Sequence, residues 1–352
     1  MKSTAAPLLP HAFDELAARV RVELDAILRP WLESRVDRAR GLGPDVQDLA
    51  NAIRDLALRG GKRFRAILLV CAFGACGGEG GLDSVGPAAI AIELLQTYLL
   101  IHDDWMDDDD VRRGGPSVPA VMRARFPEHA DEGSVLAGDL AAAWARAALM
   151  ELRLEPSRVI AAARELARVE QAVVEGQWLD VRGFAHDLEG VEAGLVLKTA
   201  SYTTSGPVAI GAVLAGSDEG TVAALAEFAD PLGIAFQLRD DLLDLFGDAA
   251  TMGKPGRSDL RKGKRTSVVL DAMRDPSARE AILSVLGRAD ATDSELSEVS
   301  RRVDESGARR RVEVRIECLV QQARAALDRA RLRPAGHALL SQAALALTER
   351  GR

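Results

Sequence analysis

The sequence predicts an all-α protein that folds as a single helical domain. Ala, Leu, Arg and Glu, which favour helices, are abundant, whereas runs of β-branched residues are scarce. Apolar residues recur at helical spacing, and no low-complexity linker divides the chain. The 352 residues, 47% hydrophobic and 28% charged, are sufficient for a large core and ordinary for a soluble globular protein.

The first third of the chain contains the clearest helix signals. Apolar positions predict a helix over 12–40, in which Pro30 is expected to kink or divide it. A second helix is predicted over 45–58, and a third opens at Lys62. Residues 87–107 are apolar on every side until the aspartates, which predicts a central, buried helix.

The remaining helices follow from weaker patterns. A loop is expected from Arg113 to about residue 133, and short helices alternate with loops over 276–352. With the helix over 12–40 and a central part over 45–270, these segments are expected to form one domain over 1–352. Between the loop and the C-terminal part, helices are predicted over 134–152, 156–177, 188–204, 206–215, 218–247 and 265–274.

Composition excludes several functional classes. A formal net charge of −8 argues against a nucleic-acid partner, because such binding requires a basic surface. The three cysteines do not form a disulfide framework, and the first eleven residues lack the apolar stretch of a secretory signal. The longest apolar run, near Pro207–Ala215, is far shorter than a membrane span of about 20 residues. A cytoplasmic location without a transmembrane segment is therefore expected.

Two aspartate clusters share one spacing, with carboxylates at i, i+1 and i+4. On a helix, side chains at i and i+4 lie on one face, where like charges are unfavourable unless a cation lies between them. Mg²⁺ is typically held by one or two carboxylates together with substrate phosphates. Each cluster follows an apolar helix, so together they predict a phosphate-bearing substrate held through metal. The clusters are Asp103, Asp104 and Asp107, and Asp240, Asp241 and Asp244.

Basic residues occur close to both clusters. Lys62 and Arg65 are three residues apart at the predicted start of a helix, where the helix dipole already favours an anion. As a group, these cations are what a doubly charged diphosphate ligand requires. The others are Arg112, Arg113, Lys198, Lys254, Lys262 and Lys264.

With these motifs in order, the chain resembles the trans-isoprenyl diphosphate synthases, or polyprenyl synthetase family. The resemblance covers about residues 45–270 and implies the all-α isoprenoid synthase (class I terpenoid synthase) fold around a central cavity. The matching segments are Gly60–Arg65, Glu93–Gln96, Asp103–Asp107 with Arg112–Gly114, Ala137–Asp139, Gln177, Lys198-Thr199, Phe236-Gln237 with Asp240–Asp244, Gly253-Lys254, Ser258–Leu260 and Gly263-Lys264.

The resemblance implies a role for each motif residue. The six aspartates would bind three Mg²⁺, for which Mn²⁺ can substitute, and these ions would bridge to the diphosphate of an allylic substrate. That substrate would also contact Arg112, Lys198, Thr199, Gln237, Lys254 and Lys264. Isopentenyl diphosphate would be bound by Lys62, Arg65, Gln96 and Arg113, with Gln96 in a position where many bacterial members carry His.

The implied reaction is a chain elongation. Diphosphate leaves the allylic substrate, Thr199 and Gln237 present oxygen dipoles to the carbocation, and the double bond of isopentenyl diphosphate attacks it. Tyr98 and Leu99, five and four residues before Asp103, are expected to limit the product. Their pattern favours geranylgeranyl diphosphate (C20), followed by farnesyl diphosphate (C15). The resemblance also implies a homodimer.

Three other functions remain as alternatives. A class I terpene cyclase would share the fold and the first cluster, but it would not need the cations Lys62 and Arg65. A non-catalytic partner subunit would be expected to have lost aspartates or basic residues, which this chain retains. A calcium-binding protein would be expected to carry an Asp-x-Asp-x-Asp-Gly loop, which is missing.

Overall fold

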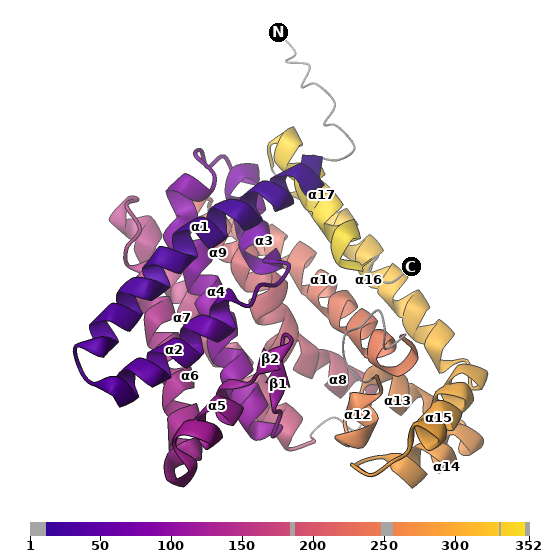
Figure 1. The fold of residues 1–352 in the computed structure, drawn as a ribbon. Coiled ribbons are helices and arrows are strands. Elements are labelled where there is room, and N and C mark those ends of the chain that lie inside the picture. The colour runs from indigo at the N-terminus through magenta and orange to yellow at the C-terminus, as the bar shows by residue number, and fades with distance from the viewer. Residues whose placement is uncertain (1–11, 184–186, 248–255, 331, 349–352) are drawn as a thin grey trace. The chain divides into compact units, whose positions relative to one another are not determined.

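The computed structural model describes residues 12–183, 187–247, 256–330 and 332–348. Helices make up nearly all regular structure within these residues. The only strands among them form one ribbon of two strands, each two residues long (Figure 1). The predicted all-α class is therefore confirmed.

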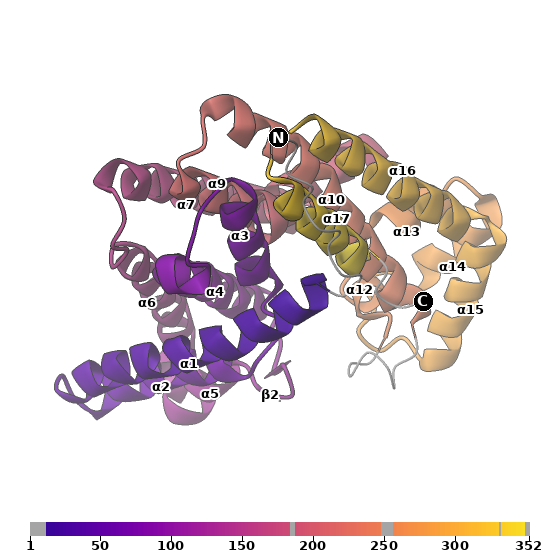
Figure 2. The ribbon, with the colours of Figure 1, turned by 90° about the horizontal axis from the view of Figure 1, so that it is seen from above.

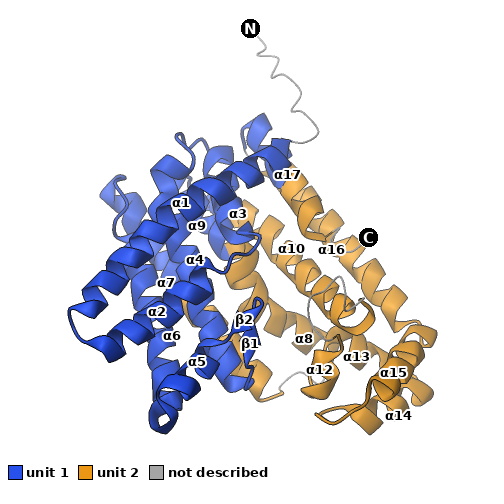
Figure 3. Ribbon diagram, viewed as in Figure 1, with its two compact units in different colours: residues 1–168, 206–222, 331–340 blue, residues 169–205, 223–330, 341–352 orange. Residues whose placement is uncertain are grey.

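The chain divides into two compact units (Figure 3). Three long helices, α7, α10 and α17, contribute residues to both units. The single domain with a central cavity stays a prediction. Unit 1 comprises residues 1–168, 206–222 and 331–340, and unit 2 comprises residues 169–205, 223–330 and 341–352.

Unit 1 is organised around the apolar helix α4. This helix packs against α6 and α3, and α3 in turn packs against α9. Helices α1 and α2 lie side by side, as Figures 1 and 2 both show. The helices are α1 (Ala12–Arg40), α2 (Pro44–Leu58), α3 (Phe64–Ala75), α4 (Leu82–Met106), α5 (Val118–Arg125), the 3₁₀ helix η1 (Pro127–His129), α6 (Ala130–Leu149), the first part of α7 (Pro156–Val181) and α9 (Gly206–Ala215).

Two predictions for unit 1 were wrong in detail. Helix α1 runs through Pro30 from Ala12 to Arg40, so Pro30 does not divide it, and the alternative of a kink stays a prediction. Helix α3 begins at Phe64 rather than at Lys62, because Arg63 adopts a left-handed conformation with φ of 50°. The expected loop after Arg113 contains α5, which the Ser117 hydroxyl caps by accepting a hydrogen bond from the Ala120 N–H at 3.1 Å.

The same segment contains a short antiparallel ribbon. Strand β1 (Val111–Arg112) pairs with β2 (Gly115–Pro116). Gly114 allows the tight turn with a φ of 71°, and Arg113 precedes it with a φ of 52°. The ribbon folds the chain back beside the end of α4, so that Arg112 lies close to the first aspartate cluster.

Helix α4 is long and apolar enough, by length and composition alone, to cross a membrane. Its most apolar 18-residue window has a mean hydropathy of 1.5, and 67% of that window is buried inside the structure. Such burial is typical of the core helix of a globular protein, so the window is weak support for a membrane span.

Unit 2 has its core between α10 and the C-terminal helices. Leu238, Leu242 and Leu245 of α10 join a buried cluster with apolar residues from α12 to α16. The elements are the rest of α7, α8 (Leu188–Leu195), the π-helix η2 (Val196–Ser205), α10 (Glu219–Phe246), α12 (Ser258–Arg261), α13 (Ser267–Ala272), α14 (Pro276–Val285), α15 (Asp293–Glu305), α16 (Ala308–Arg329) and the end of α17 (Pro334–Thr348).

Candidate functional site

The first aspartate cluster lies at the end of α4 in unit 1. Asp103 and Asp104 occupy the last turn, and Asp107 is the C-cap residue, whose backbone N–H bonds the Asp103 carbonyl at 2.8 Å. The side chain of Asp104 is fully buried, whereas those of Asp103 and Asp107 are partly exposed. Residues adjacent in sequence therefore differ sharply in their exposure to solvent.

Arg112 of the ribbon binds the buried carboxylate. Its Nε donates to Asp104 Oδ1 at 2.7 Å, and its Nη2 lies 3.8 Å from Asp103 Oδ2 and 3.3 Å from Asp109 Oδ2. Burial raises the pKa of Asp104 to about 6, although Arg112 opposes this shift. The second oxygen of Asp104, Oδ2, is buried without a hydrogen-bond partner. One cation thus bridges several carboxylates that would otherwise repel each other.

The additional aspartates that follow the cluster have a different environment. Asp108 and Asp110 are exposed and both form ion pairs with Arg123 of α5. Pairs of this kind on a surface contribute little to stability. These two residues therefore connect α5 to the turn after α4 and lie outside the set of motif aspartates.

Three of the four residues predicted for isopentenyl diphosphate come together in unit 1. With its amide oxygen turned toward the arginines, Gln96 accepts hydrogen bonds from Arg65 Nη1 at 2.9 Å and Arg113 Nη2 at 3.1 Å. Lys62 is exposed in the turn that leads into α3. These residues, Lys62, Arg65, Gln96 and Arg113, are called the cation cluster below.

The cation cluster is close to the glycine turn between α2 and α3. A Cβ added at Gly61 would lie 3.5 Å from Arg113 Nη2, so the turn backbone passes directly beside this guanidinium. Burial lowers the pKa of Arg113, and Arg63, Arg65 and Arg112 add repulsion that Glu93 partly offsets. Like charges gathered in this way favour an anionic ligand.

The second aspartate cluster lies near the end of α10 in unit 2. Asp241 is buried and accepts a hydrogen bond from Gln237 Nε2 at 2.8 Å. Burial, followed by the charge of Asp259, raises the pKa of Asp241 well above its ordinary value. Asp240 remains partly exposed. The pattern of the first cluster recurs, with one buried and one partly exposed carboxylate.

Asp244, the third member, interacts with the segment that follows. Its Oδ1 accepts from the Ser258 hydroxyl at 2.8 Å, and its Oδ2 accepts from the Asp259 N–H at 3.1 Å. Because these donors lie in the first turn of α12, the carboxylate stabilises that turn as a cap does. Asp244 therefore holds the basic segment with Lys262 and Lys264 against α10.

The π-helix η2 positions Lys198 and Thr199. Thr199 Oγ1 donates to Gln237 Oε1 at 3.3 Å, which joins the two residues predicted to present oxygen dipoles to a carbocation. Lys198 forms an ion pair with Asp180 of α7. π-Helical turns occur often at functional sites, because they displace side chains from regular helical positions.

Two glycines allow neighbouring helices to approach η2. A Cβ at Gly176 of α7 would lie 2.4 Å from the Lys198 backbone nitrogen, and one at Gly233 of α10 would lie 2.4 Å from the Ala200 Cβ. Real Cβ atoms do not approach this closely, so both positions require glycine. The π-helix is therefore held between α7 and α10.

Two acidic residues were missed by the sequence analysis. Asp180 pairs with Lys198, and Asp259 lies near Asp241 and Asp244. Burial and then Asp244 raise the pKa of Asp259 to about 6, while Lys264 opposes the shift. The sequence offered one signal for each residue. Asp180 lies three residues after the matched Gln177, and Asp259 lies within the matched segment Ser258–Leu260, to which no role was given.

The remaining predicted site residues are Tyr98, Leu99, Lys254 and Lys264. Tyr98 and Leu99 are partly buried on α4, and the Tyr98 ring meets the His102 ring edge-on with centroids 4.9 Å apart. Gly138 of α6 leaves room for His102, since a Cβ there would lie 2.1 Å from its Nε2. Lys264 is partly exposed after α12, and Lys254 lies outside the described residues.

The donor chemistry of both clusters fits Mg²⁺. All six side chains are carboxylates, hard oxygen donors that this ion prefers, and one buried oxygen, Asp104 Oδ2, has no protein partner. As the side chains stand in the part of the chain that the structure describes, no group of three or more His, Cys, Asp or Glu residues is arranged to hold a metal ion. The metal-binding roles therefore stay predictions.

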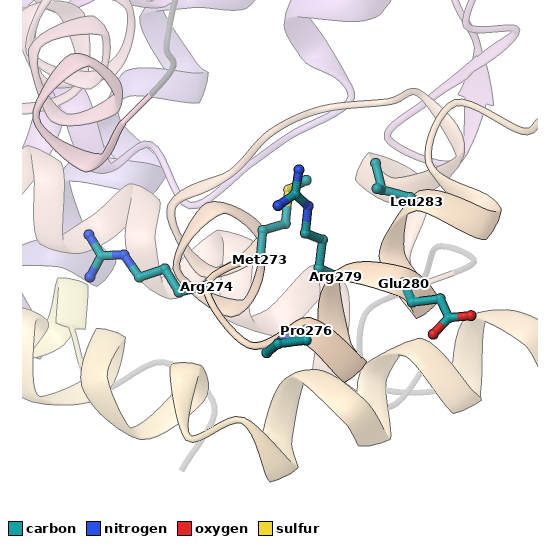
Figure 4. A pocket seen from close by; sticks show the side chains of 6 residues that line it. All are labelled: Met273, Arg274, Pro276, Arg279, Glu280 and Leu283. Atoms are coloured by element: carbon teal, nitrogen blue, oxygen red, sulfur yellow. The ribbon is translucent and has the colours of Figure 1, made fainter.

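A separate cavity of about 350 Å³ lies in unit 2 (Figure 4). It is lined by Met273, Arg274, Pro276, Arg279, Glu280 and Leu283. In Figure 4, Arg274 and Glu280 extend away from each other rather than converging on one point. None of the residues predicted to bind substrate lines this cavity.

Known proteins share both the sequence and the fold. The polyprenyl synthetase family model matches residues 46–303. A short chain isoprenyl diphosphate synthase from Methanocaldococcus jannaschii is 36% identical, with 71% of this chain and 74% of that protein covered. A geranylgeranyl diphosphate synthase from Methanosarcina mazei is 35% identical, with 74% and 78% covered.

A solved structure resembles the chain over most of its length. It is the geranylgeranyl pyrophosphate synthase from Corynebacterium glutamicum, complexed with isoprenyl diphosphate and magnesium. The similarity has a TM-score of 0.85 at 32% identity and covers 93% of this chain and 99% of that one. The predicted fold is thereby confirmed as that of the prenyl synthases.

Proposed function

Because the chain belongs to the polyprenyl synthetase family and is a prenyltransferase, we propose that it makes geranylgeranyl diphosphate from isopentenyl diphosphate and an allylic diphosphate. The observation that carries this proposal is the cation cluster, in which both Arg65 and Arg113 lie within hydrogen-bonding distance of the Gln96 side-chain amide. A terpene cyclase has a single diphosphate substrate and no use for this second anion site. The cluster therefore favours a synthase.

The two diphosphates are assigned to different residues. The cation cluster binds isopentenyl diphosphate through its guanidinium and ammonium groups, which form charge-assisted hydrogen bonds to phosphate oxygens. Arg112, Lys198 and Lys264 bind the allylic diphosphate, together with Lys254. The six motif aspartates hold Mg²⁺, which when bound neutralises diphosphate charge and stabilises its departure.

The residues of the chain then guide the reaction. The C1–O bond of the allylic substrate breaks, and its electron pair leaves with the diphosphate that the cations bind. The linked oxygens of Thr199 and Gln237 stabilise the allylic carbocation. The isopentenyl double bond forms the new C–C bond, and the proton lost from the adjacent carbon passes to the released diphosphate.

Tyr98 supports a short product. At about 1.5 Å per residue, a side chain five positions before Asp103 lies roughly 7.5 Å along α4 from the metal-binding end. A ring there, held edge-on by His102, limits the length of the growing tail. Geranylgeranyl diphosphate is favoured because Leu99, one position nearer to the aspartates, is not aromatic. Farnesyl diphosphate is the alternative product.

A homodimer is part of the proposal. Val174, Trp178 and Val181 lie on one face of α7 and are 52%, 63% and 56% exposed. An exposed apolar stripe at this spacing suits a subunit interface. Sedimentation velocity should show a dimer, and Trp178→Asp should increase the monomer fraction.

One assay tests the function directly. Purified protein is supplied with labelled isopentenyl diphosphate, Mg²⁺ and either dimethylallyl, geranyl or farnesyl diphosphate, and the products are sized by chromatography. We expect a C20 product with each primer and no turnover after chelation of divalent metal. Cyclised hydrocarbon formed from geranylgeranyl diphosphate alone would contradict the proposal.

A further inference from the structure

Arg63 lies within the isopentenyl diphosphate motif but faces away from the predicted ligand. Nearby in sequence, Lys62 is exposed and Arg65 is partly exposed, whereas the Arg63 side chain is only 2% exposed. Burying a guanidinium is costly unless every donor is satisfied and its charge is paired. The partners of Arg63 therefore indicate what this residue does.

These partners come from three helices of unit 1. Nη1 donates to Glu93 Oε2 of α4 at 2.8 Å, and Nη2 donates to the Ala57 carbonyl of α2 at 2.9 Å. Nε and Nη2 also donate to Asp25 Oδ1 of α1, at 3.1 and 2.9 Å. The residue that precedes α3 is thus bound simultaneously to α1, α2 and α4.

The backbone at Arg63 shows that these contacts hold a strained turn. Its φ of 50° and ψ of 30° are left-handed, a conformation that is unfavourable for a residue with a side chain. Gly60 and Gly61 before it have φ values of 83° and 142°, which glycine tolerates. A strained conformation of this kind persists only where surrounding contacts determine it.

The strained turn carries half of the cation cluster. Lys62 immediately precedes Arg63, and Arg65 follows it in the first turn of α3. Glu93, the buried partner of Arg63, lies one helical turn before Gln96, which bonds Arg65 and Arg113. The ion pair therefore ties the turn to the segment of α4 that bears the other half of the cluster.

We propose that Arg63 is a positioning residue, whose contacts with the buried Glu93 and the half-exposed Asp25 set the spacing of Lys62 and Arg65 against Gln96 and Arg113 for isopentenyl diphosphate. This inference rests on the proposed function, because it names a determinant of that same binding site. Arg63 itself does not contact substrate. Its replacement should impair recognition of one of the two diphosphates and leave the other unaffected.

The test compares Arg63→Lys with Arg35→Lys in the full-length protein. Arg35 is a matched control, since it lies in unit 1 and pairs with Glu151 at 2.6 Å, away from the cluster. Lysine keeps a charge for Glu93 but loses the fork that also reaches Asp25. We expect Arg63→Lys to raise the KM for isopentenyl diphosphate about tenfold or more, with the allylic KM within about twofold of wild type. Arg35→Lys should change neither KM.

A second pair of variants applies if Arg63→Lys fails to fold. Asp25 is 51% exposed on α1, so Asp25→Ala removes one arm of the contact without opening the core. Glu23→Ala, at an exposed position of the same helix, is its control. Asp25→Ala should raise the isopentenyl KM about threefold with the allylic KM unchanged. Unfolding midpoints confirm that each variant is folded.

The outcomes separate the inference from the function. If the wild type is active and the folded Arg63 or Asp25 variants keep both KM values, the inference alone is overturned. Equal increases in the isopentenyl and allylic KM values would overturn it as well. A wild type that elongates no allylic diphosphate would contradict the proposed function instead.

Discussion

At the scale of single residues, burial differentiates side chains that the sequence motif treats alike. Asp104 is fully buried against Arg112, while its neighbour Asp103 keeps access to solvent. Asp241 and Asp240 repeat this division in the second cluster. The spacing i, i+1, i+4 identifies the carboxylates, but the packing around each helix end determines how far each of them is exposed.

Tyr98 provides a prediction at this scale. Tyr98→Ala removes the ring that is proposed to end the tail site, so products longer than the wild-type product are expected in chromatography. Leu100→Ala, two positions further along α4, is a size-reducing control that should leave product length unchanged. An identical product distribution for Tyr98→Ala and wild type would exclude Tyr98 as the limit.

At the scale of elements, the π-helix η2 decides how unit 2 presents its functional groups. The sequence predicted one regular helix over 188–204, but the chain changes to π-helical turns at Val196. The change accompanies the glycine contacts at Gly176 and Gly233, where α7 and α10 approach the η2 backbone. The spacing of apolar residues within 188–204 does not reveal such contacts, because they are made by residues of α7 and α10.

Substitution of Gly176 tests this role of α7. Gly176→Ala should destabilise the protein by about 1–3 kcal/mol and lower kcat, because the new methyl group would displace the backbone at Lys198. Gly194→Ala is the matched control, since nothing lies within 4 Å of a Cβ there. That change should be neutral or slightly stabilising. Chemical denaturation and steady-state assays of both variants provide the comparison.

Helix α15 supplies a prediction about pH. Glu295 accepts hydrogen bonds from the Thr292 N–H and hydroxyl in a capping box, which, with Arg288, lowers its pKa from 4.5 to about 2. Because the pKa is lower in the folded state, the stabilising contribution is complete above about pH 4.5 and is lost as the pH falls toward 2. Glu295→Gln should therefore be less stable than wild type at pH 7.

The difference in stability between wild type and Glu295→Gln should narrow steadily between pH 4.5 and 3. Urea titrations at several pH values measure this difference. A gap that stayed constant over that range would show that the ionised carboxylate contributes nothing through the cap.

At the scale of the whole molecule, the two aspartate clusters belong to different compact units. The proposed function requires both to act on one diphosphate. Residues that serve one ligand show strongly non-additive effects when they are removed together. The proposal therefore predicts kinetic coupling between the two clusters in the complete chain.

A double-mutant cycle measures this coupling. Asp103→Asn and Asp240→Asn should each lower kcat about a hundredfold or more, because each removes a carboxylate proposed to bind Mg²⁺. The double variant should be much less impaired than the product of the two effects. Multiplicative losses would indicate that the clusters act independently, while far-UV circular dichroism verifies that the variants are folded.

The helical class, the order of the family motifs and the residue types that suit a diphosphate and Mg²⁺ could all be predicted from the amino-acid sequence. This was possible because helix propensity, i to i+4 spacing and ligand chemistry depend on residues close together in the chain. Most of α1, α2, α4 and α10 was predictable for the same reason. The start of α3 was not, because the left-handed Arg63 depends on partners in three other helices.

The folded arrangement of the helices was needed to establish which motif residues are buried and which groups meet. It paired Asp104 with Arg112, Lys198 with Asp180 and Thr199 with Gln237, and it buried Arg63 against Glu93. Except for Asp104 and Arg112, which are eight residues apart, these contacts join residues at least 18 positions apart in the sequence. Close packing brings such residues together, and buried polar groups in folded proteins are hydrogen-bonded. Local patterns specify the chemical groups, whereas packing specifies their environment.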